Sequence, residues 1–324
     1  MSVSTPTAPS RWRGPLRQSY GLLQAFAVLI LLVVMISLLS PRFLSTTNIT
    51  NLMAQMSVNL IVAAGMTVVM IGGEFDISVG SVVALSAAIS AWMMTRYGIA
   101  AGVFASLLVG PALGVVNGVI VTRGRIPSFI ATLGTMMMAR SLAFVVTQGR
   151  VIANLPDDFK AIGQGTTFGI PTPFLIALVT YALGWVLMTR TAFGKKVYAV
   201  GANRTVAMLS GIRADRVKIL TLVVVGLCSS FAGNLLLSRI GAIQADTARG
   251  LEFEVIAAVV IGGTSLYGGQ GNILRTIIGV IIIALIRNFL NLSRIDIFWQ
   301  DFATGAIIVL AVLLDALQKR IGRG

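Results

Sequence analysis

The sequence predicts an all-α membrane protein with about ten transmembrane helices and both termini in the cytoplasm, and three observations support this. Of the 324 residues, 56% are hydrophobic and only 11% are charged, whereas soluble domains carry about 25% charged residues. Apolar runs long enough to cross about 30 Å of hydrocarbon recur along the whole chain. Lysine and arginine gather in alternate connections between these runs, as expected of a polytopic protein.

The apolar runs place the spans in chain order. The first run follows a basic stretch, is longer than the core of a cleaved signal peptide and lacks an A-x-A-like site, so we expect a retained span. Residues 1–20 then form a cytoplasmic tail, 21–318 the transmembrane domain and 319–324 a second cytoplasmic tail. The expected spans are 21–40, 55–72, 77–94, 98–122, 128–147, 170–189, 219–238, 254–267, 273–291 and 301–316.

The distribution of basic residues predicts the orientation. With the N-terminus in the cytoplasm, the inside segments hold 16 of the 25 Lys and Arg residues and the outside segments hold 8, while Arg140 falls within a span. This two-to-one bias follows the positive-inside rule. The longest inside connection, residues 190–218, carries seven of the 16.

Composition also limits the function. A net charge of +14 suggests nucleic acid in a soluble protein, but no soluble basic domain is present to bind it, so we expect no nucleic-acid partner. The chain has no histidine and one cysteine, Cys228, and so lacks the commonest general base and the commonest metal ligand. We therefore expect no catalytic site and no metal site.

The chain also lacks the phosphate-cradling pattern G-x-x-x-x-G-K-[ST]. In "AFGKKV" a threonine, Thr189, stands where that pattern needs its first glycine. The chain is therefore not expected to hydrolyse ATP or to be an enzyme. If it transports a solute, its energy must come from an ion gradient, passive flow or a partner.

Glycines recur at helical spacing in the fourth span, "LLVGPALGVVNGVIV". Gly110, Gly114 and Gly118 lie four residues apart and form one smooth stripe along a helix. Such stripes let helices approach closely in lipid. We interpret this one as a packing surface within the chain.

Two double-glycine segments, "VVMIGGEFDISVG" (68–80) and "AVVIGGTSLYGGQG" (258–271), resemble each other. Because irregular backbone at membrane depth needs protein or water around it, we expect tightly turned helix junctions at a protein-lined site. Asp76 or Ser78 would cap the third span, where the helix dipole favours a carboxylate. The alternative is a cation or proton site at Glu74 and Asp76.

Arg140 lies inside the fifth span, in "TMMMARSLAF". An intramembrane arginine is a functional candidate and needs a partner. Asp76 or Glu74 would serve as that partner. The alternative is a shifted span that leaves Arg140 near a membrane interface.

The inside connection reads "RTAFGKKVYAVGANRTVAMLSGIRADRVK". Asn203 predicts the N-cap of a short helix over Arg204–Leu209, which Gly211 stops. A cytoplasmic helix with one apolar face needs either a protein partner or the membrane surface.

Four long segments resemble the ribose-type permeases of bacterial ATP-binding-cassette (ABC) sugar importers. They are "LSPRFLSTTNITNLMAQMSVNLIVAAGMTVVMIGGEFDISVGS", "GVIVTRGRIPSFIATLGTMMMARSLAFVVTQG", "TRTAFGKKVYAVGANRTVAMLSGIRADRVKI" and "EVIAAVVIGGTSLYGGQGNILRTIIGVIIIALIRNFLNL", in the family's order. The resemblance implies a multi-pass protein of the bacterial inner membrane that imports a monosaccharide or polyol. It also implies a second permease subunit, which is a copy or a sister chain, cytoplasmic ATPase subunits that bind ATP and Mg²⁺, and a periplasmic sugar-binding protein.

The resemblance implies roles for particular residues. The loop 190–218 would contain the coupling helix, with Asn203, Ala207, Leu209, Ser210 and Gly211 in contact with the ATPase. The family often has an acidic residue after this asparagine, where Arg204 stands here. Pore-side architecture would rest on Gly72, Gly73, Asp76, Ser78, Gly80, Arg140, Gly262, Gly263 and Gly268.

Two other functions stay open at this point. One is an ABC permease of the related branched-chain amino-acid type, against which "GGTSLYGGQGNI" argues. The other is an ion-coupled secondary transporter that uses Asp76 and Glu74 as a proton relay. Only the second would transport actively without an ATPase.

Overall fold

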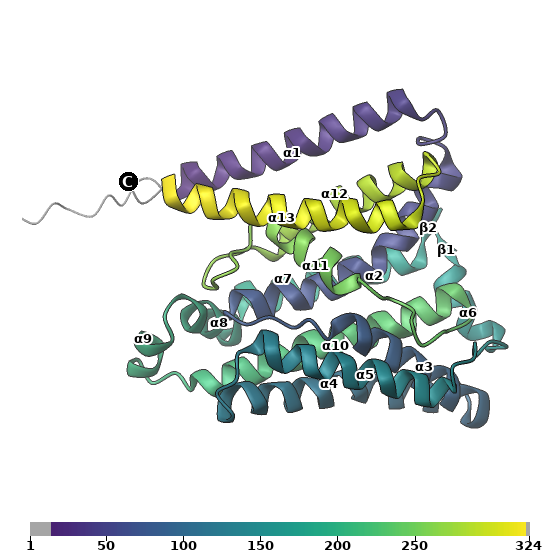
Figure 1. Ribbon diagram of the computed structural model, residues 1–324, viewed down its shortest axis with the longest axis horizontal. Helices are drawn as coiled ribbons and strands as arrows, with labels where there is room; N and C mark the ends of the chain where they lie inside the picture. Colours follow the sequence, from purple (N-terminus) through teal and green to yellow (C-terminus); the bar gives the residue numbers. More distant parts are fainter. Residues whose placement is uncertain (1–13, 322–324) are drawn as a thin grey trace, which may run out of the picture.

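The computed structural model describes residues 14–321, which form helices and one short hairpin (Figure 1). Two-residue strands β1 (Thr166–Thr167) and β2 (Ile170–Pro171) pair antiparallel. The helices are α1 (Gly14–Leu39), α2 (Thr46–Ile71), α3 (Val79–Tyr97), α4 (Ile99–Arg123), α5 (Ser128–Thr147), α6 (Asp157–Gln164), α7 (Thr172–Arg190), α8 (Ala192–Ala202), α9 (Arg204–Leu209), α10 (Ala214–Ile240), α11 (Leu251–Ile261), α12 (Ile273–Leu292) and α13 (Ile297–Ile321).

Seven of these helices are long and apolar enough to cross a membrane, which confirms the all-α polytopic class. They are α2, α3, α4, α5, α7, α10 and α12. The first predicted span overlaps α1, and the Phe26–Leu39 segment of this helix is apolar. The last falls within α13. The total of ten spans stays a prediction. Of the predicted tails, 1–20 and 319–324, residues 1–13 and 322–324 lie outside the described residues, whereas residues 14–20 begin α1 and residues 319–321 end α13.

The predicted eighth span, 254–267, is wrong as a full crossing. The helix in this region, α11, has 11 residues and ends at Ile261. At a rise of about 1.5 Å per residue, it covers roughly half of the hydrocarbon thickness. Gly263 adopts a φ of 84°, and the chain then loops back to Asn272, which caps α12 with its side chain. The apolar run is thus divided by a glycine turn.

The two ends of the described chain lie on the same side of the molecule. Figure 1 shows the start of α1, the end of α13 and the α8–α9 segment at one end, and α6 with the hairpin at the other. We call these the α9 end and the α6 end. Chain ends on one side are what an even number of crossings requires, while the side that faces the cytoplasm stays a prediction.

Helices α2 and α10 form the centre of the bundle. Nearly every residue of α2 from Met56 to Ile71 is buried, and most of the second half of α10 is buried as well. Helices α4, α5 and α7 have far fewer buried residues than α2. Large exposed side chains such as Phe104, Met137 and Leu183 are therefore available to lipid.

The glycine stripe of α4 packs against α10, as predicted. A Cβ atom on Gly110 would overlap the carbonyl oxygen of Gly226, and one on Gly114 would lie 2.5 Å from the Leu222 carbonyl oxygen. The Gly110 amide donates a hydrogen bond of 2.7 Å to Ser230 Oγ. Backbone meets backbone here because neither helix has side chains in the way.

We expect Gly110→Ala to destabilise the bundle by about 1–3 kcal/mol, since the added methyl group must push two helix backbones apart. Thermal unfolding in detergent measures this loss. Gly134→Ala is the matched control, because Gly134 lies on exposed α5 and a Cβ added there would meet no atom within 4 Å. Equal unfolding temperatures for the two variants would contradict the packing role of the stripe.

Candidate coupling site and glycine junction

The connection between α7 and α10 folds into the two helices α8 and α9. Asn203 is extended, with φ −160° and ψ 105°, and its side-chain oxygen accepts a hydrogen bond of 3.1 Å from the Val206 amide. Gly211 adopts a φ of 81°, which ends the helix. The predicted cap, helix and stop are therefore confirmed, because each depends on local backbone chemistry.

The outer face of α9 is apolar and exposed. Leu209 is 84% exposed and Val206 57% exposed, whereas Ala207 is buried against the rest of the chain. Ser210 is exposed, and its hydroxyl donates back to the Val206 carbonyl oxygen at 3.0 Å. Exposed apolar side chains at a helical tip are typical of a docking surface. Of the predicted coupling residues, Leu209 is thus the one most available to a partner.

Arg204 is engaged within the chain. Its guanidinium contacts the Asp215 carboxylate of α10 at 2.7 Å, and both side chains are about half exposed. Such a pair contributes little to stability, but it holds α9 against the first turn of α10.

Helix α8 contacts both double-glycine segments. A Cβ atom on Gly201 would overlap the Ile71 carbonyl oxygen and would lie 2.6 Å from the Gly269 amide nitrogen. That amide donates a hydrogen bond of 2.8 Å to the Ile71 carbonyl oxygen. A Cβ on Gly268 would lie 2.7 Å from the Cα of Gly73. We call the meeting point of Gly73, Gly201, Gly268 and Gly269 the glycine junction.

Two side chains brace the glycine junction. The Tyr198 hydroxyl of α8 donates to the Gly271 carbonyl oxygen at 2.9 Å, and burial raises the pKa of Tyr198, so the hydroxyl keeps the proton that it donates. Lys218 of α10 forms an ion pair with Glu74, whose side chain is buried next to Gly73. The segment around α9 is thus connected to the junction through α8 and through α10.

The two double-glycine segments form the same helix cap. Gly72 and Gly262 have φ values of −68° and −66°, and the glycine after each has a φ of 82° or 84°. The next amide returns to the carbonyl oxygen five residues earlier, Glu74 to Val69 at 3.1 Å and Thr264 to Val259 at 3.2 Å. Both are Schellman motifs, which confirms the predicted tight junctions.

Asp76 fixes the turn that leads into α3. Its carboxylate accepts hydrogen bonds from the Ser78 amide at 2.8 Å and the Ser78 hydroxyl at 2.5 Å. Ser78 occupies the N-cap position but makes no side-chain cap bond, so neither residue caps α3 as predicted, and Asp76 instead holds the turn that precedes the helix. Gly80 lies directly against the Glu252 carboxylate and the Ala248 carbonyl oxygen, where a Cβ would not fit.

The predicted partners of Arg140 are wrong. Its guanidinium donates to the carbonyl oxygens of Ala245 and Thr247 at 2.8 and 2.7 Å, while Glu74 pairs with Lys218 and Asp76 with Ser78. Backbone carbonyl groups in the loop between α10 and α11 need hydrogen-bond donors, and the Arg140 guanidinium provides them. Arg140 therefore anchors a loop more than 100 residues further along the chain.

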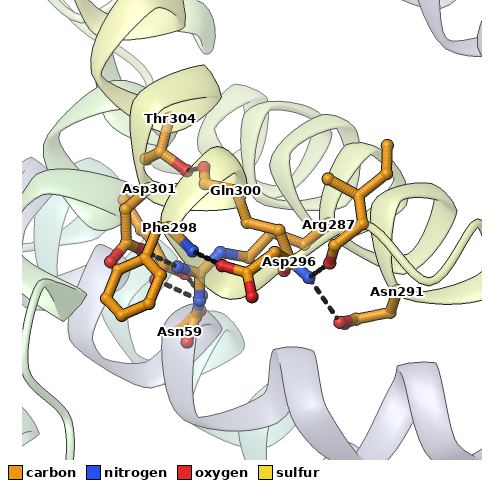
Figure 2. A network of polar contacts seen from close by, with 10 residues as sticks. Asn59, Arg287, Asn291, Asp296, Phe298, Gln300, Asp301 and Thr304 are labelled. Atoms are coloured by element: carbon orange, nitrogen blue, oxygen red, sulfur yellow. Dashed lines mark hydrogen bonds and ion pairs between the residues drawn. The ribbon is translucent and has the colours of Figure 1, made fainter.

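Sequence reasoning missed a second polar group, at the N-terminal part of α11. The Glu254 carboxylate is buried and accepts from Asn59 at 2.9 Å and from Arg287 at 2.5 Å. Figure 2 shows Asn59 and Arg287 within this network. Two acids two residues apart at the edge of an apolar run, in "LEFEV", were the available signal. In the part of the chain that the structure describes, no group of three or more His, Cys, Asp or Glu side chains is placed to hold a metal ion.

Residues 48–312 match the family described as "Branched-chain amino acid transport system / permease component". The chain belongs to this permease family. Among its relatives, the ribose import permease proteins of Haemophilus influenzae and Bacillus subtilis are 40% and 41% identical to it. The alignments cover 90% of this permease and 92% and 91% of those proteins.

An L-arabinose ABC transporter permease protein of Azospirillum brasilense is 36% identical over 98% of this permease and 94% of its own length. These relatives confirm the resemblance to ribose-type ABC permeases that the sequence segments indicate. No solved structure matches the chain.

Proposed function

We propose that this permease is the membrane-spanning subunit of an ABC importer that carries a monosaccharide or related polyol across the bacterial inner membrane. The observation that carries the proposal is its similarity, over at least nine-tenths of the chain, to permeases named for ribose and L-arabinose. The family description alone names amino acids. The sugar-named relatives favour the sugar over the amino-acid alternative.

The charge distribution supports the α9 end as the cytoplasmic end. The segments expected inside carry 16 Lys and Arg residues against 8 outside, and the basic 190–218 connection folds at the α9 end (Figure 1). An ATPase subunit would then bind α9, and a periplasmic binding protein would dock at the α6 end. A second permease subunit, either a copy or a sister chain, completes the pore.

The contacts of α8 suggest how a motor at α9 drives transport. When the ATPase subunits close, they displace α9, which follows α8 after the single residue Asn203. Because α8 meets Ile71 and Gly269 backbone to backbone, a displacement of α8 reaches the end of α2 and the α11–α12 loop together. Packed elements of this kind switch between discrete arrangements, which would close and open the inner side of the pore.

The ion-coupled alternative needs Asp76 and Glu74 to exchange protons with a pathway. Both carboxylates have structural partners, Ser78 for Asp76 and Lys218 for Glu74. These contacts favour turn-fixing and junction-bracing roles for the two acids. The chain itself therefore needs no proton relay in the proposed mechanism.

Uptake in a bacterial strain that lacks its own pentose and hexose importers tests the proposal. The strain expresses the permease together with an ABC ATPase and a periplasmic sugar-binding protein from the same organism, and radiolabelled D-ribose, L-arabinose, D-allose and L-leucine are offered separately. We expect accumulation of at least one sugar and no accumulation of leucine. Leucine uptake without sugar uptake would overturn the proposed substrate class.

A further inference from the structure

The Asn59–Glu254–Arg287–Asp301 group lies on the half of the bundle away from α9 and joins four helices. Its members come from α2, α11, α12 and α13, and we call it the outer polar cluster. Arg287 lies five residues before the end of α12, and Asp301 lies in the first turns of α13. The α12–α13 turn is at the α6 end in Figure 1, which faces the periplasm under the proposed orientation.

Exposure increases along the outer polar cluster from the interior to the surface. The side chain of Glu254 is 5% exposed, that of Arg287 34% and that of Asp301 68%. The three charged groups thus form a path that begins at the surface and ends at a buried carboxylate. Charged groups in membrane-spanning helices are costly, and those that face the protein interior commonly mark a substrate or ion pathway.

The donors of Arg287 are only partly used. One terminal nitrogen contacts Glu254 at 2.5 Å, and the other is 3.5 Å from Asp301, which is a long contact. The Nε atom is buried and has no hydrogen-bond partner among the described residues. A guanidinium has five N–H donors, so Arg287 retains the capacity to donate to a ligand.

We propose that the outer polar cluster binds the hydroxyl groups of a neutral sugar or polyol on its way into the pore. Carboxylates accept from hydroxyl groups and Arg287 donates to them, which suits a ligand whose every hydroxyl does both. Phe298 shares a face of α13 with Asp301, one turn away (Figure 2), and its 78% exposed ring offers an apolar surface to the C–H face of a sugar. With two carboxylates and one guanidinium, the cluster disfavours an anionic ligand.

This inference rests on the proposed function and names the substrate-contacting residues for it. Saturation-transfer NMR on the purified full-length permease in nanodiscs, without ATPase or binding protein, tests it with D-ribose, L-arabinose and D-allose as probes. We expect saturation transfer to at least one sugar and none to gluconate. Asp301→Ala should weaken that binding about tenfold, as expected for loss of a hydrogen bond to a charged group.

Matched variants separate recognition from structure. Asp301→Glu should restore binding, since it retains the carboxylate, and Asp158→Ala should bind as the wild type does, because Asp158 is an exposed acid on α6. Equal sugar binding by wild type and Asp301→Ala, or no binding of any probe, would overturn the inference. If the inference is overturned but the complete transporter still takes up sugar, the proposed function stands. If the complete transporter takes up no sugar either, the proposed function itself is contradicted.

Discussion

Replacing Leu209 with aspartate is expected to abolish sugar uptake while the permease stays folded in the membrane. Leu209 is 84% exposed, so its loss removes no core contact. If α9 docks in the ATPase, however, the charge is buried at the centre of the contact, and central positions contribute about 2 kcal/mol or more, or roughly thirtyfold in affinity. Uptake and ATP hydrolysis by proteoliposomes containing the complete transporter measure the effect.

Thr205→Asp is the matched control for this experiment. It adds the same charge to the same six-residue helix at an exposed position without removing an apolar side chain. We expect Thr205→Asp to retain most of the uptake, and both variants to unfold at the wild-type temperature in detergent. Normal uptake by Leu209→Asp would remove α9 as the coupling helix.

Gly201→Ala is expected to break the close backbone contact between α8 and the glycine junction. The new methyl group would overlap the Ile71 carbonyl oxygen and crowd the Gly269 amide, and these two groups are hydrogen-bonded to each other. All the neighbouring atoms are backbone, so they cannot rotate away as a side chain would. We expect a loss of about 1–3 kcal/mol in stability and at least a tenfold loss of uptake.

Two measurements distinguish the loss of this α8 contact from a lower amount of folded permease. Uptake is normalised to folded permease in the proteoliposomes, and ATP hydrolysis is followed alongside it, since uncoupled hydrolysis is the expected signature. Gly305→Ala serves as the control, because a Cβ at Gly305 of α13 meets no atom within 4 Å. Uptake by Gly201→Ala at the wild-type level would show that α8 transmits no movement through this contact.

Features that depend on local chemistry were predictable from the sequence. Asn203 and Gly211 bound α9 because a capping side chain and a positive-φ residue act within a few residues. The double glycines at Gly72 and Gly262 end their helices for the same reason. The stripe on α4 needed only the helical period to be recognised as a packing face.

Features that depend on distant contacts were not predictable. Arg140 binds carbonyl groups of a loop that the sequence alone does not place beside it. Nothing in the sequence marks Gly201 as a contact residue, because it is a single glycine within a helix. Its role follows only from the packing of α8 against Ile71. The length of α11 was overestimated for a different reason, which is local: the span was assigned from hydropathy alone, although the Gly262–Gly263 turn ends the helix at Ile261.

The central claim is that this permease moves a solute only when a separate motor acts on α9. Purified permease is reconstituted in two sets of liposomes, one with the chain alone under a proton gradient and one with ATPase, binding protein and internal ATP. We predict accumulation of radiolabelled sugar in the second set and none in the first. Accumulation by the chain alone, driven by the proton gradient, would contradict the account.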